Sequence, residues 1–332
     1  MRLATFRPAR SDMTLGEAAV SGAPIWGEPT WGEPTWGEPT WGVVLGEEVL
    51  DVPRASAGRR DADLFAPTLK GQIARFGKDL TPVVRLLAEL GPDGGAAARH
   101  RLDAVAVLPP VPDTGKFICV GKNNRIHLEE LKRNQLITEL PEEPTGFVKL
   151  TSCLVGQDGE VARPEGIVEF DYEPELAFVI ARRAYKVPRE EAMDHVLGIS
   201  LINDLTAREI QRREVRSGTR FWTAKNMPGF GPVGPFVVTL DESGDPEDLW
   251  ISCAVNGRER LRFNTGEQIF KIPDIIAHFS RHVVLEPGDM FSTGSPHGVA
   301  VGQPNASELF LRPGDRVDVT AEGIMTLRTT IV

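Results

Sequence analysis

Apolar positions recur with helical spacing in one part of the chain and form strand-like runs in most of the rest. From Thr68 to Leu90 they fall three and four residues apart, with Gly77 and Pro82 between two groups, which predicts two short helices. Further helices are predicted over residues 123–135, 188–198, 206–215 and 273–281.

Strand signals dominate the last hundred residues. Asn256-Gly257 separates the runs 251–255 and 258–263 and suits the positive φ angles of a type I′ hairpin turn. The segments LEPGD and LRPGD place proline and then glycine where a type II turn requires them, each before a further strand. Because the strands cluster without regular alternation with helices, the pattern favours a β-rich α+β fold over a doubly wound sheet.

The prolines of VAVLPPVP suggest a domain boundary near residue 112. We therefore expect a small leading domain over 1–112 and a larger domain over 113–332. Within the first, three copies of Trp-Gly-Glu-Pro-Thr occupy 26–40 and a fourth begins at Trp41. Proline and glycine in every unit disfavour helix and central strand, so 26–42 is expected to be an enlarged loop. The alternative is a segment that binds a partner or touches lipid.

Composition narrows the class of protein. The 332 residues are 41% hydrophobic and 25% charged, as in an ordinary folded domain, and the formal net charge of -10 argues against a general nucleic-acid binder. No apolar run reaches the roughly 18 to 20 residues that span a bilayer, so we expect a cytoplasmic protein without a membrane partner. Cys119, Cys153 and Cys253 form no CxxC pair and are expected to be reduced packing residues.

Two acidic residues stand one position apart at the head of the apolar strand DYEPELAFVI. Glu173 and Glu175 point to the same face, where like charges cost stability unless something neutralises them. Asp204 follows the next apolar run, GISLIN, and Thr206 with Glu209 predicts a capping box at the start of a helix. Three carboxylates without cysteine or histidine favour Mg²⁺, Mn²⁺ or Ca²⁺ over zinc. The alternative is a set of solvated strand ends.

Five other polar side chains could take part in chemistry. His127 and Glu130 lie three apart on a predicted helix, where a carboxylate can orient an imidazole as a general base, or the two can form an exposed ion pair. Lys225 lies in a loop rich in proline and glycine and could hold an anionic oxygen or face solvent. Arg208 and Gln211 are three residues apart and share one face of the predicted helix that starts just after Asp204. Both side chains could therefore extend toward the same place as that carboxylate.

Two further segments carry weaker signals. The turn that begins at Thr293 offers hydroxyl and N–H groups that could bind a carboxylate. The arginines of 208–220 are interrupted by Glu209 and Glu214 and lack interleaved aromatic residues. Apart from Arg208, this stretch is expected to be a solvated helix face and not an RNA-binding patch.

From Lys116 to the C-terminus, these segments taken together resemble the fumarylacetoacetate hydrolase family. The matching segments are VGKNNRIHLEE, FVKL, DYEPELAFVI, INDLTAREIQ, WTAK, VNGRERLRFNT, LEPGDMFSTGSPHGV and LRPGDRVDVTAEGIMTLR. The resemblance implies a mixed β-roll catalytic domain preceded by a smaller α+β domain, and a homodimer. The chain departs from the family pattern at Asn124, where the family often has tyrosine, and at Asn226, where it often has serine. The pentapeptide repeat has no family counterpart.

The resemblance also implies roles for the polar residues. The ligands of a divalent cation, Mg²⁺ or Mn²⁺ with Ca²⁺ as an alternative, would be Glu173, Glu175 and Asp204. The residues that hold substrate oxygens would be Arg208, Gln211 and Lys225, the last also stabilising the charge that develops during catalysis. His127 and Glu130 would form a water-activating dyad on a lid, and the Thr293 turn would face the substrate.

The implied activity is metal-dependent hydrolysis of a C–C bond in a 1,3-diketo acid through a metal-bound enolate, of the kind found in aromatic catabolism. The substrate would be a small anionic dicarbonyl compound of the fumarylacetoacetate, fumarylpyruvate or acylpyruvate type. An oxaloacetate-type decarboxylase and a 2-hydroxyhepta-2,4-dienedioate-type isomerase are alternatives within the family, and water activation by His127 favours hydrolysis. A non-enzymatic scaffold that recruits a partner through the tryptophan repeat would need neither the lid nor the lysine.

Overall fold

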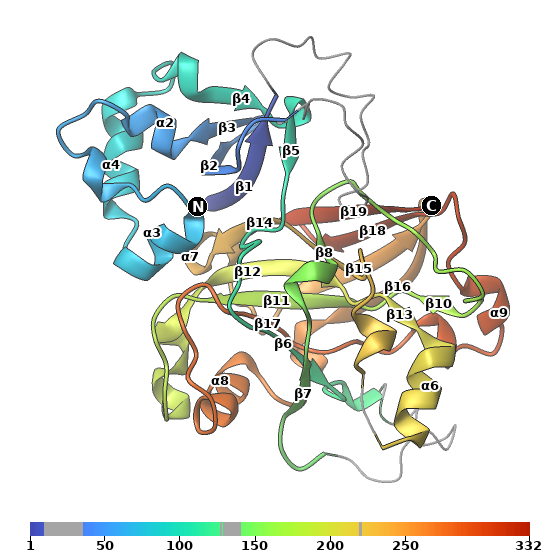
Figure 1. The fold of residues 1–332 in the computed structure, drawn as a ribbon. Coiled ribbons are helices and arrows are strands. Elements are labelled where there is room, and N and C mark those ends of the chain that lie inside the picture. Colours follow the sequence, from blue (N-terminus) through green and yellow to red (C-terminus); the bar gives the residue numbers. More distant parts are fainter. Residues whose placement is uncertain (10–35, 127, 129–140, 219–220) are drawn as a thin grey trace.

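The protein is described by a computed structural model that covers residues 1–9, 36–126, 128, 141–218 and 221–332. Within these residues a large mixed sheet crosses the molecule, and a second sheet packs against one of its faces (Figure 1). The leading part, with its own short helices, lies at one end of the large sheet. The predicted β-rich α+β fold is confirmed.

The large sheet contains twelve strands among the described residues. They are β1 (Arg2–Pro8), β2 (Thr40–Leu45), β3 (Glu48–Asp51), β4 (Arg99–Arg101), β5 (Val105–Val107), β6 (Phe117–Gly121), β7 (Thr145–Val148), β8 (Leu154–Val155), β11 (Pro174–Ile180), β12 (Val196–Asn203), β14 (Gly231–Thr239) and β17 (Met290–Ser292). The order is β4-β3-β2-β1-β14-β12-β11-β17-β6-β7, with β5 on β1 and β8 on β14. Strand β1 of the leading part pairs with β14, so hydrogen bonds join the two parts of the chain.

The second sheet has five strands in the part of the chain that is described. These are β9 (Gly159–Val161), β15 (Trp250–Val255), β16 (Arg258–Asn264), β18 (Arg316–Ala321) and β19 (Met325–Ile331), in the order β16-β15-β18-β19-β9. The predicted hairpin between β15 and β16 is confirmed, since Asn256 and Gly257 have φ angles of 53° and 74°. A short ladder joins β10 (Phe170–Asp171) to β13 (Thr206–Ala207).

The helices are short. They are α2 (Val52–Ser56), α3 (Leu69–Phe76), α4 (Thr81–Leu90), α6 (Arg208–Arg216), α7 (Leu240–Ser243), α8 (Ile272–Ser280) and α9 (Ala306–Leu309). Of these, α3, α4 and α8 contribute apolar residues to the cores beside the large sheet. Helices α3, α4 and α8 confirm their predictions; the hydroxyl of Thr68 caps α3, and proline near the start of α4 suits a helix N-terminus. None of the helices in the described residues is both long and apolar enough to cross a membrane.

Two helix predictions were wrong in part. Segment 188–198 forms a 3₁₀ helix over Arg189–His195, and strand β12 then starts at Val196 because its apolar residues are buried on both faces of the sheet. The capping box before α6 does not form. Thr206 lies in β13, and the carboxylate of Glu209 instead accepts hydrogen bonds from the N–H groups of residues 168 and 169.

The end of the pentapeptide repeat belongs to the fold of the leading part. Strand β2 begins at Thr40, so the last residues of the predicted loop form a strand. Trp41 is fully buried, and its indole N–H donates to the carbonyl of Ala66 at 2.8 Å. Gly42 is required there, because a Cβ atom would lie 2.1 Å from the carbonyl oxygen of Leu50. The repeat copies over 26–35 lie outside the described residues.

Strand β11 is buried on both faces and determines which way the acidic residues point. Leu176 and Phe178 pack in the core between the two sheets, whereas Ala177 and Val179 belong to a second core that includes residues of α3 and α4. Because strand side chains alternate, Glu175 lies on the same face as Ala177 and Val179. The three cysteines are buried and free, as predicted.

Candidate metal and substrate site

The carboxylates of Glu173, Glu175 and Asp204 meet where β11 begins and β12 ends. The two strands are antiparallel, with Pro174 opposite Asn203, so the head of one lies beside the end of the other. One carboxylate oxygen from each acidic residue lies within 4.8 Å of those from the other two, and all three side chains are buried. These residues are therefore not solvated strand ends.

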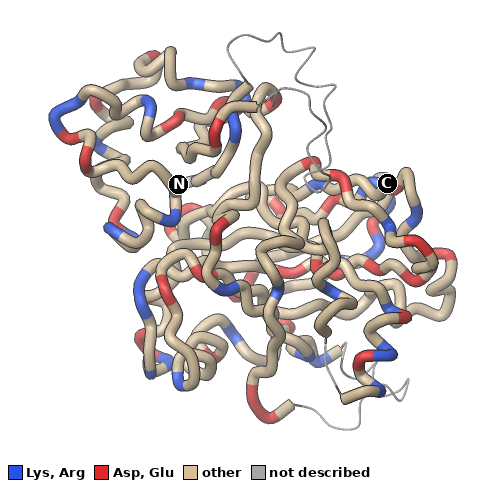
Figure 2. The backbone as a smooth tube through the Cα atoms, viewed as in Figure 1, with Lys and Arg blue, Asp and Glu red and all other residues tan. Residues whose placement is uncertain are grey.

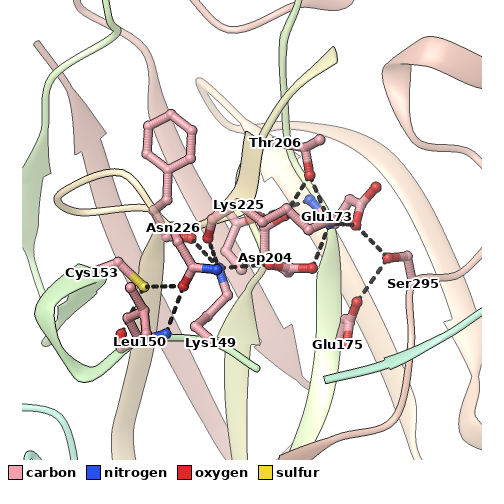
Figure 3. Close-up of polar contacts among 12 residues, drawn as sticks. Lys149, Leu150, Cys153, Glu173, Glu175, Asp204, Thr206, Lys225, Asn226 and Ser295 are labelled. Carbon is pink, nitrogen blue, oxygen red and sulfur yellow. Dashed lines mark hydrogen bonds and ion pairs between the residues drawn. The ribbon is translucent and has the colours of Figure 1, made fainter. Parts of the chain in front are cut away.

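The ammonium of Lys225 contacts two of these carboxylates. A 3₁₀ turn over Thr223–Lys225 carries the lysine, and its ammonium donates to Glu173 Oε2 and Asp204 Oδ2, both at 2.5 Å, and to Thr206 Oγ1 at 2.8 Å (Figure 3). Burial alone would lower the pKa of Lys225, but Asp204 and Glu173 outweigh it and raise the pKa. The lysine is thus buried and charged, and it does not face solvent.

Arg208 is held by a carboxylate that lies outside the triad. Its Nε donates to Asp171 Oδ2 at 2.8 Å, and its Nη2 forms ion pairs with Asp171 Oδ2 at 2.7 Å and Glu173 Oε1 at 2.6 Å. Its Nη1 donates to Gln211 Oε1 at 3.0 Å, so the predicted shared face of these two residues is present. Asp171 in turn accepts from the N–H groups of Ala300 and Val301. The guanidinium therefore has a fixed orientation.

The turn after β17 closes the other side of the site. Ser295 Oγ lies 2.6 Å from Glu173 Oε2 and 2.7 Å from Glu175 Oε1, and the N–H of Gly294 donates to Glu175 Oε2 at 2.9 Å. The Thr293 hydroxyl instead bonds to Leu176 and Gln268. The hydroxyl that contacts the triad is thus that of Ser295, two residues after the predicted Thr293.

The carboxylates have opposite pKa shifts. Burial, Asp204 and Glu173 raise the pKa of Glu175 to about 8. Burial also acts against ionisation of Glu173, but Arg208 and Lys225 lower its pKa below the ordinary value. Glu175 therefore lacks a sufficient positive partner among the described protein groups, and a buried set of oxygen donors of this kind fits a hard divalent cation.

A model of the fumarylacetoacetate (FAA) hydrolase C-terminal domain matches residues 116–332 of this chain. The chain belongs to the fumarylacetoacetate hydrolase family. An uncharacterised protein of Staphylococcus aureus strain USA300 is 34% identical over 289 residues, which cover 86% of this chain and 92% of the relative.

Two solved structures of the family are similar. The fumarylacetoacetate hydrolase of Exiguobacterium antarcticum is 28% identical with a TM-score of 0.70, and the match covers 99% of each chain. The 5-carboxymethyl-2-hydroxymuconate delta-isomerase of Mycobacterium smegmatis is 32% identical with a TM-score of 0.59, over 70% of this chain and 84% of the isomerase. Fold similarity therefore extends to a hydrolase and to an isomerase, and both support an enzyme.

Sequence reasoning missed two residues of this site. Asp171 shares the strand parity of Glu173 and Glu175, and that spacing was the available signal for it. Lys149 is fully buried, but a lone lysine after a strand usually faces solvent. The turn that begins at Thr293 was singled out for its hydroxyl and N–H groups, but the groups that bind the carboxylates are those of Ser295 and Gly294. The predicted His127 and Glu130 lie outside the described residues.

The structure shows what the two departures from the family pattern contact. Asn226 accepts from the N–H of Leu150 at 2.6 Å and donates to the carbonyls of Val148 and Trp222 at 3.1 and 2.9 Å, so it ties the end of β7 to the Lys225 turn. Asn124 is buried, and its amide lies 3.5 Å from Glu267 Oε2. Asn226 therefore has a structural role beside the site.

We expect binding of Mg²⁺ or Mn²⁺ to release a proton near neutral pH, because Glu175 is protonated below its raised pKa of about 8 and must ionise to bind the cation. The apparent affinity should increase as the pH rises to that value and then level off. Calorimetry in buffers of different ionisation enthalpy measures the released proton. The same titration at about pH 9.5 is the control, since Glu175 is then already ionised. Equal proton release at both pH values would contradict the assignment.

Proposed function

We propose that this protein is a divalent-metal-dependent hydrolase that cleaves a C–C bond in a small anionic 1,3-diketo acid of the acylpyruvate or fumarylpyruvate type. The observation that supports it most is the buried triad of carboxylates with the Lys225 ammonium on two of them. Hard oxygen ligands beside a buried cationic donor suit a substrate whose neighbouring oxygens carry negative charge. The similar structure of a fumarylacetoacetate hydrolase supports hydrolysis.

The donor set fits Mg²⁺ or Mn²⁺, which would be held by Glu173, Glu175 and Asp204. Three carboxylates lie close enough to share one cation, and the raised pKa of Glu175 reflects negative charge that the described protein groups do not balance. Such a cation, when bound, supplies Lewis-acid stabilisation of negative charge on carbonyl oxygens.

The proposed reaction adds water across the C–C bond. The oxygen of water bonds to the acyl carbonyl carbon, and the bond from that carbon to the methylene carbon breaks. The electron pair of this bond goes to the methylene carbon, which takes up a proton, so the products are a carboxylic acid and a 2-oxo acid. Lys225 would hold the developing oxyanion, and Arg208 with Gln211 would orient the substrate carboxylate. His127, oriented by Glu130, would remove the proton from water.

Replacing His127 by alanine should separate metal binding from chemistry. We expect Mn²⁺ affinity to stay nearly unchanged, because a general base is not a ligand, and turnover to fall by about 10²- to 10⁴-fold. Titration calorimetry and steady-state kinetics measure the two quantities on the same preparation. A parallel loss of metal affinity and turnover would exclude the proposed role of His127.

A substrate panel tests the proposed reaction. Acetylpyruvate, fumarylpyruvate and oxaloacetate would be incubated with the Mg²⁺- or Mn²⁺-loaded protein, while loss of the enol absorbance and formation of pyruvate are followed. Hydrolysis predicts turnover of the first two compounds, with one acid and one pyruvate per substrate. Turnover of oxaloacetate alone would replace the proposal by decarboxylation.

Isomerisation of an unsaturated dioate is a second candidate, because the similar delta-isomerase from Mycobacterium smegmatis is 32% identical to this chain. It would use the same oxygen ligands and Lys225 but would consume no water. The two reactions are therefore distinguished by their products, since isomerisation conserves the mass of the substrate.

A further inference from the structure

Asp204 is paired with two buried lysines, one on each carboxylate oxygen. Lys225 contacts Oδ2 at 2.5 Å, and Lys149 contacts Oδ1 at 2.7 Å (Figure 3). The side chain of Lys149 is 0% exposed, so its ammonium has no access to solvent in this structure. Burial would lower the pKa of Lys149, but Asp204 outweighs it and raises the pKa, so Lys149 stays charged.

The other contacts of Lys149 are to the backbone of the segment that carries Lys225. Its ammonium donates to the carbonyl of Lys225 at 2.6 Å and to that of Phe230 at 3.0 Å. A Cβ atom on Gly231 would lie 3.2 Å from Cδ of Lys149, so the aliphatic chain is closely packed as well. Two hydrogen bonds and the ion pair with Asp204 therefore hold the ammonium, and Lys149 is fixed in place.

Asn226 fixes the same region from both sides of Lys149. Its amide and carbonyl groups bond to Val148 and Leu150, which flank Lys149, and to Trp222 in the segment that precedes Lys225. The end of β7 and the Lys225 turn are therefore joined twice, once by Lys149 and once by Asn226 (Figure 3). This arrangement determines where the Lys225 side chain starts.

The two lysines differ in what they are free to do. Lys225 contacts Glu173 and Asp204 and would have to transfer hydrogen bonds from them to bind a substrate oxygen. When it does so, Lys149 would still neutralise Oδ1 of Asp204, beside the cation that this carboxylate is proposed to bind. Lys149 supplies the fixed partner, because none of its contacts is with a group that the substrate would replace.

We propose that Lys149 is a positioning residue that holds Asp204 and the backbone of Lys225, so that the Lys225 ammonium can bind an anionic substrate. This rests on the proposed function, since it assumes that Lys225 contacts the substrate. Lys149 itself does not touch the substrate. Removing the Lys149 charge should not weaken metal binding, because that charge repels the cation. It should weaken anion binding, because Lys225 would then stay on Asp204 and would be less available to the anion.

The test uses Lys149→Met and oxalate, a small dianion with two adjacent carboxylates. We expect Mn²⁺ affinity, measured by calorimetry, to be unchanged within about threefold or tighter, and oxalate affinity for the Mn²⁺-loaded protein to fall at least about tenfold. In a Lys225→Met background, Lys149→Met should cause no further loss of oxalate affinity, because its effect passes through Lys225. A purely structural role would not produce this dependence.

Lys116→Met is the matched control. Lys116 Nζ contacts Oδ2 of the buried Asp289 at 2.7 Å, at the start of β6 and outside the site. Lys116→Met also removes the lysine partner of a buried aspartate, and it should leave oxalate affinity unchanged. Thermal unfolding of each variant shows whether the fold is intact.

Different failures have different meanings. Equal oxalate affinity in Lys149→Met and the wild type, or an additive loss in the double variant, would overturn the role of Lys149 and leave the proposed hydrolysis standing. A wild-type protein that binds neither Mn²⁺ nor oxalate would overturn both proposals. Absence of acylpyruvate hydrolysis together with the predicted oxalate pattern would overturn the reaction alone.

A measurement on the wild type covers the case in which Lys149→Met does not fold. Lysine ammonium groups that are buried and hydrogen bonded exchange slowly and can be observed by ¹⁵N NMR, and Lys225→Met identifies the signal of Lys149. On addition of Mg²⁺ and oxalate, we expect the Lys225 signal to shift and the Lys149 signal to stay. A large shift or loss of the Lys149 signal would overturn the proposal.

Discussion

Replacing Lys225 by methionine is expected to lower kcat/KM for an acylpyruvate by about 10²- to 10³-fold while Mn²⁺ affinity stays at least as high as in the wild type. The ammonium is the described cation that contacts both Glu173 and Asp204, and in the proposed reaction it stabilises the developing oxyanion. Its loss removes that stabilisation and also removes a positive charge that competes with the metal. Steady-state kinetics and Mn²⁺ calorimetry measure the two effects.

The Lys116→Met variant serves as control here too, because it loses an ammonium that contacts a buried aspartate away from the triad. It should retain wild-type kcat/KM. If Lys225→Met lost Mn²⁺ affinity in proportion to activity, Lys225 would be acting on the metal site alone, and its proposed contact with substrate would be wrong.

Replacing Asp204 by asparagine should abolish Mg²⁺ and Mn²⁺ binding and also destabilise the protein without metal by about 3 to 5 kcal/mol. The substitution removes one of the three proposed metal ligands, and it leaves Lys149 without its carboxylate partner and Lys225 with Glu173 as its carboxylate partner. Urea unfolding followed by circular dichroism gives the free energy of unfolding, and calorimetry gives the metal affinity.

Glu175→Gln is the matched comparison, because it should lose metal affinity without loss of stability. The pKa of Glu175 is raised from 4.5 to about 8, so the folded protein without metal holds a proton that the unfolded chain has released. Glu175 therefore lowers the free energy of unfolding progressively as the pH rises from about 4.5 to 8, whereas glutamine does not titrate and avoids this loss. The variant should therefore be at least as stable as the wild type at about pH 8. Destabilisation equal to that of Asp204→Asn would contradict the charge balance described for the site.

The strands of the site could be predicted because their signals are local. Glu173 and Glu175 precede an apolar run and Asp204 follows one, so strand alternation and strand ends indicated a common site, and the family resemblance favoured it over solvated strand ends. The same reasoning failed at Thr206, whose hydroxyl bonds to the Asp204 carbonyl and to Lys225 and so does not cap a helix. That contact depends on the Lys225 turn, nineteen residues away in the chain.

Lys149 illustrates what the sequence could not show. Its partners are the side chain of Asp204 and the backbone of Lys225 and Phe230, which are separated from it by 55 to 81 residues. No periodicity near Lys149 distinguishes it from an exposed lysine at the end of an edge strand. Basic and acidic positions are interspersed over the described chain in Figure 2, so charge alone does not single it out either. Tertiary packing turns this lysine into a buried counter-ion.

The most direct test of the proposed reaction is to run it with acetylpyruvate in ¹⁸O-labelled water, using the Mg²⁺- or Mn²⁺-loaded protein, and to analyse the products by mass spectrometry. Hydrolysis at this site predicts one pyruvate and one acetate per substrate, with one ¹⁸O atom from water in the acetate carboxylate, and no reaction in Glu173→Gln. Release of carbon dioxide, or a product with the mass of the substrate, would contradict C–C hydrolysis.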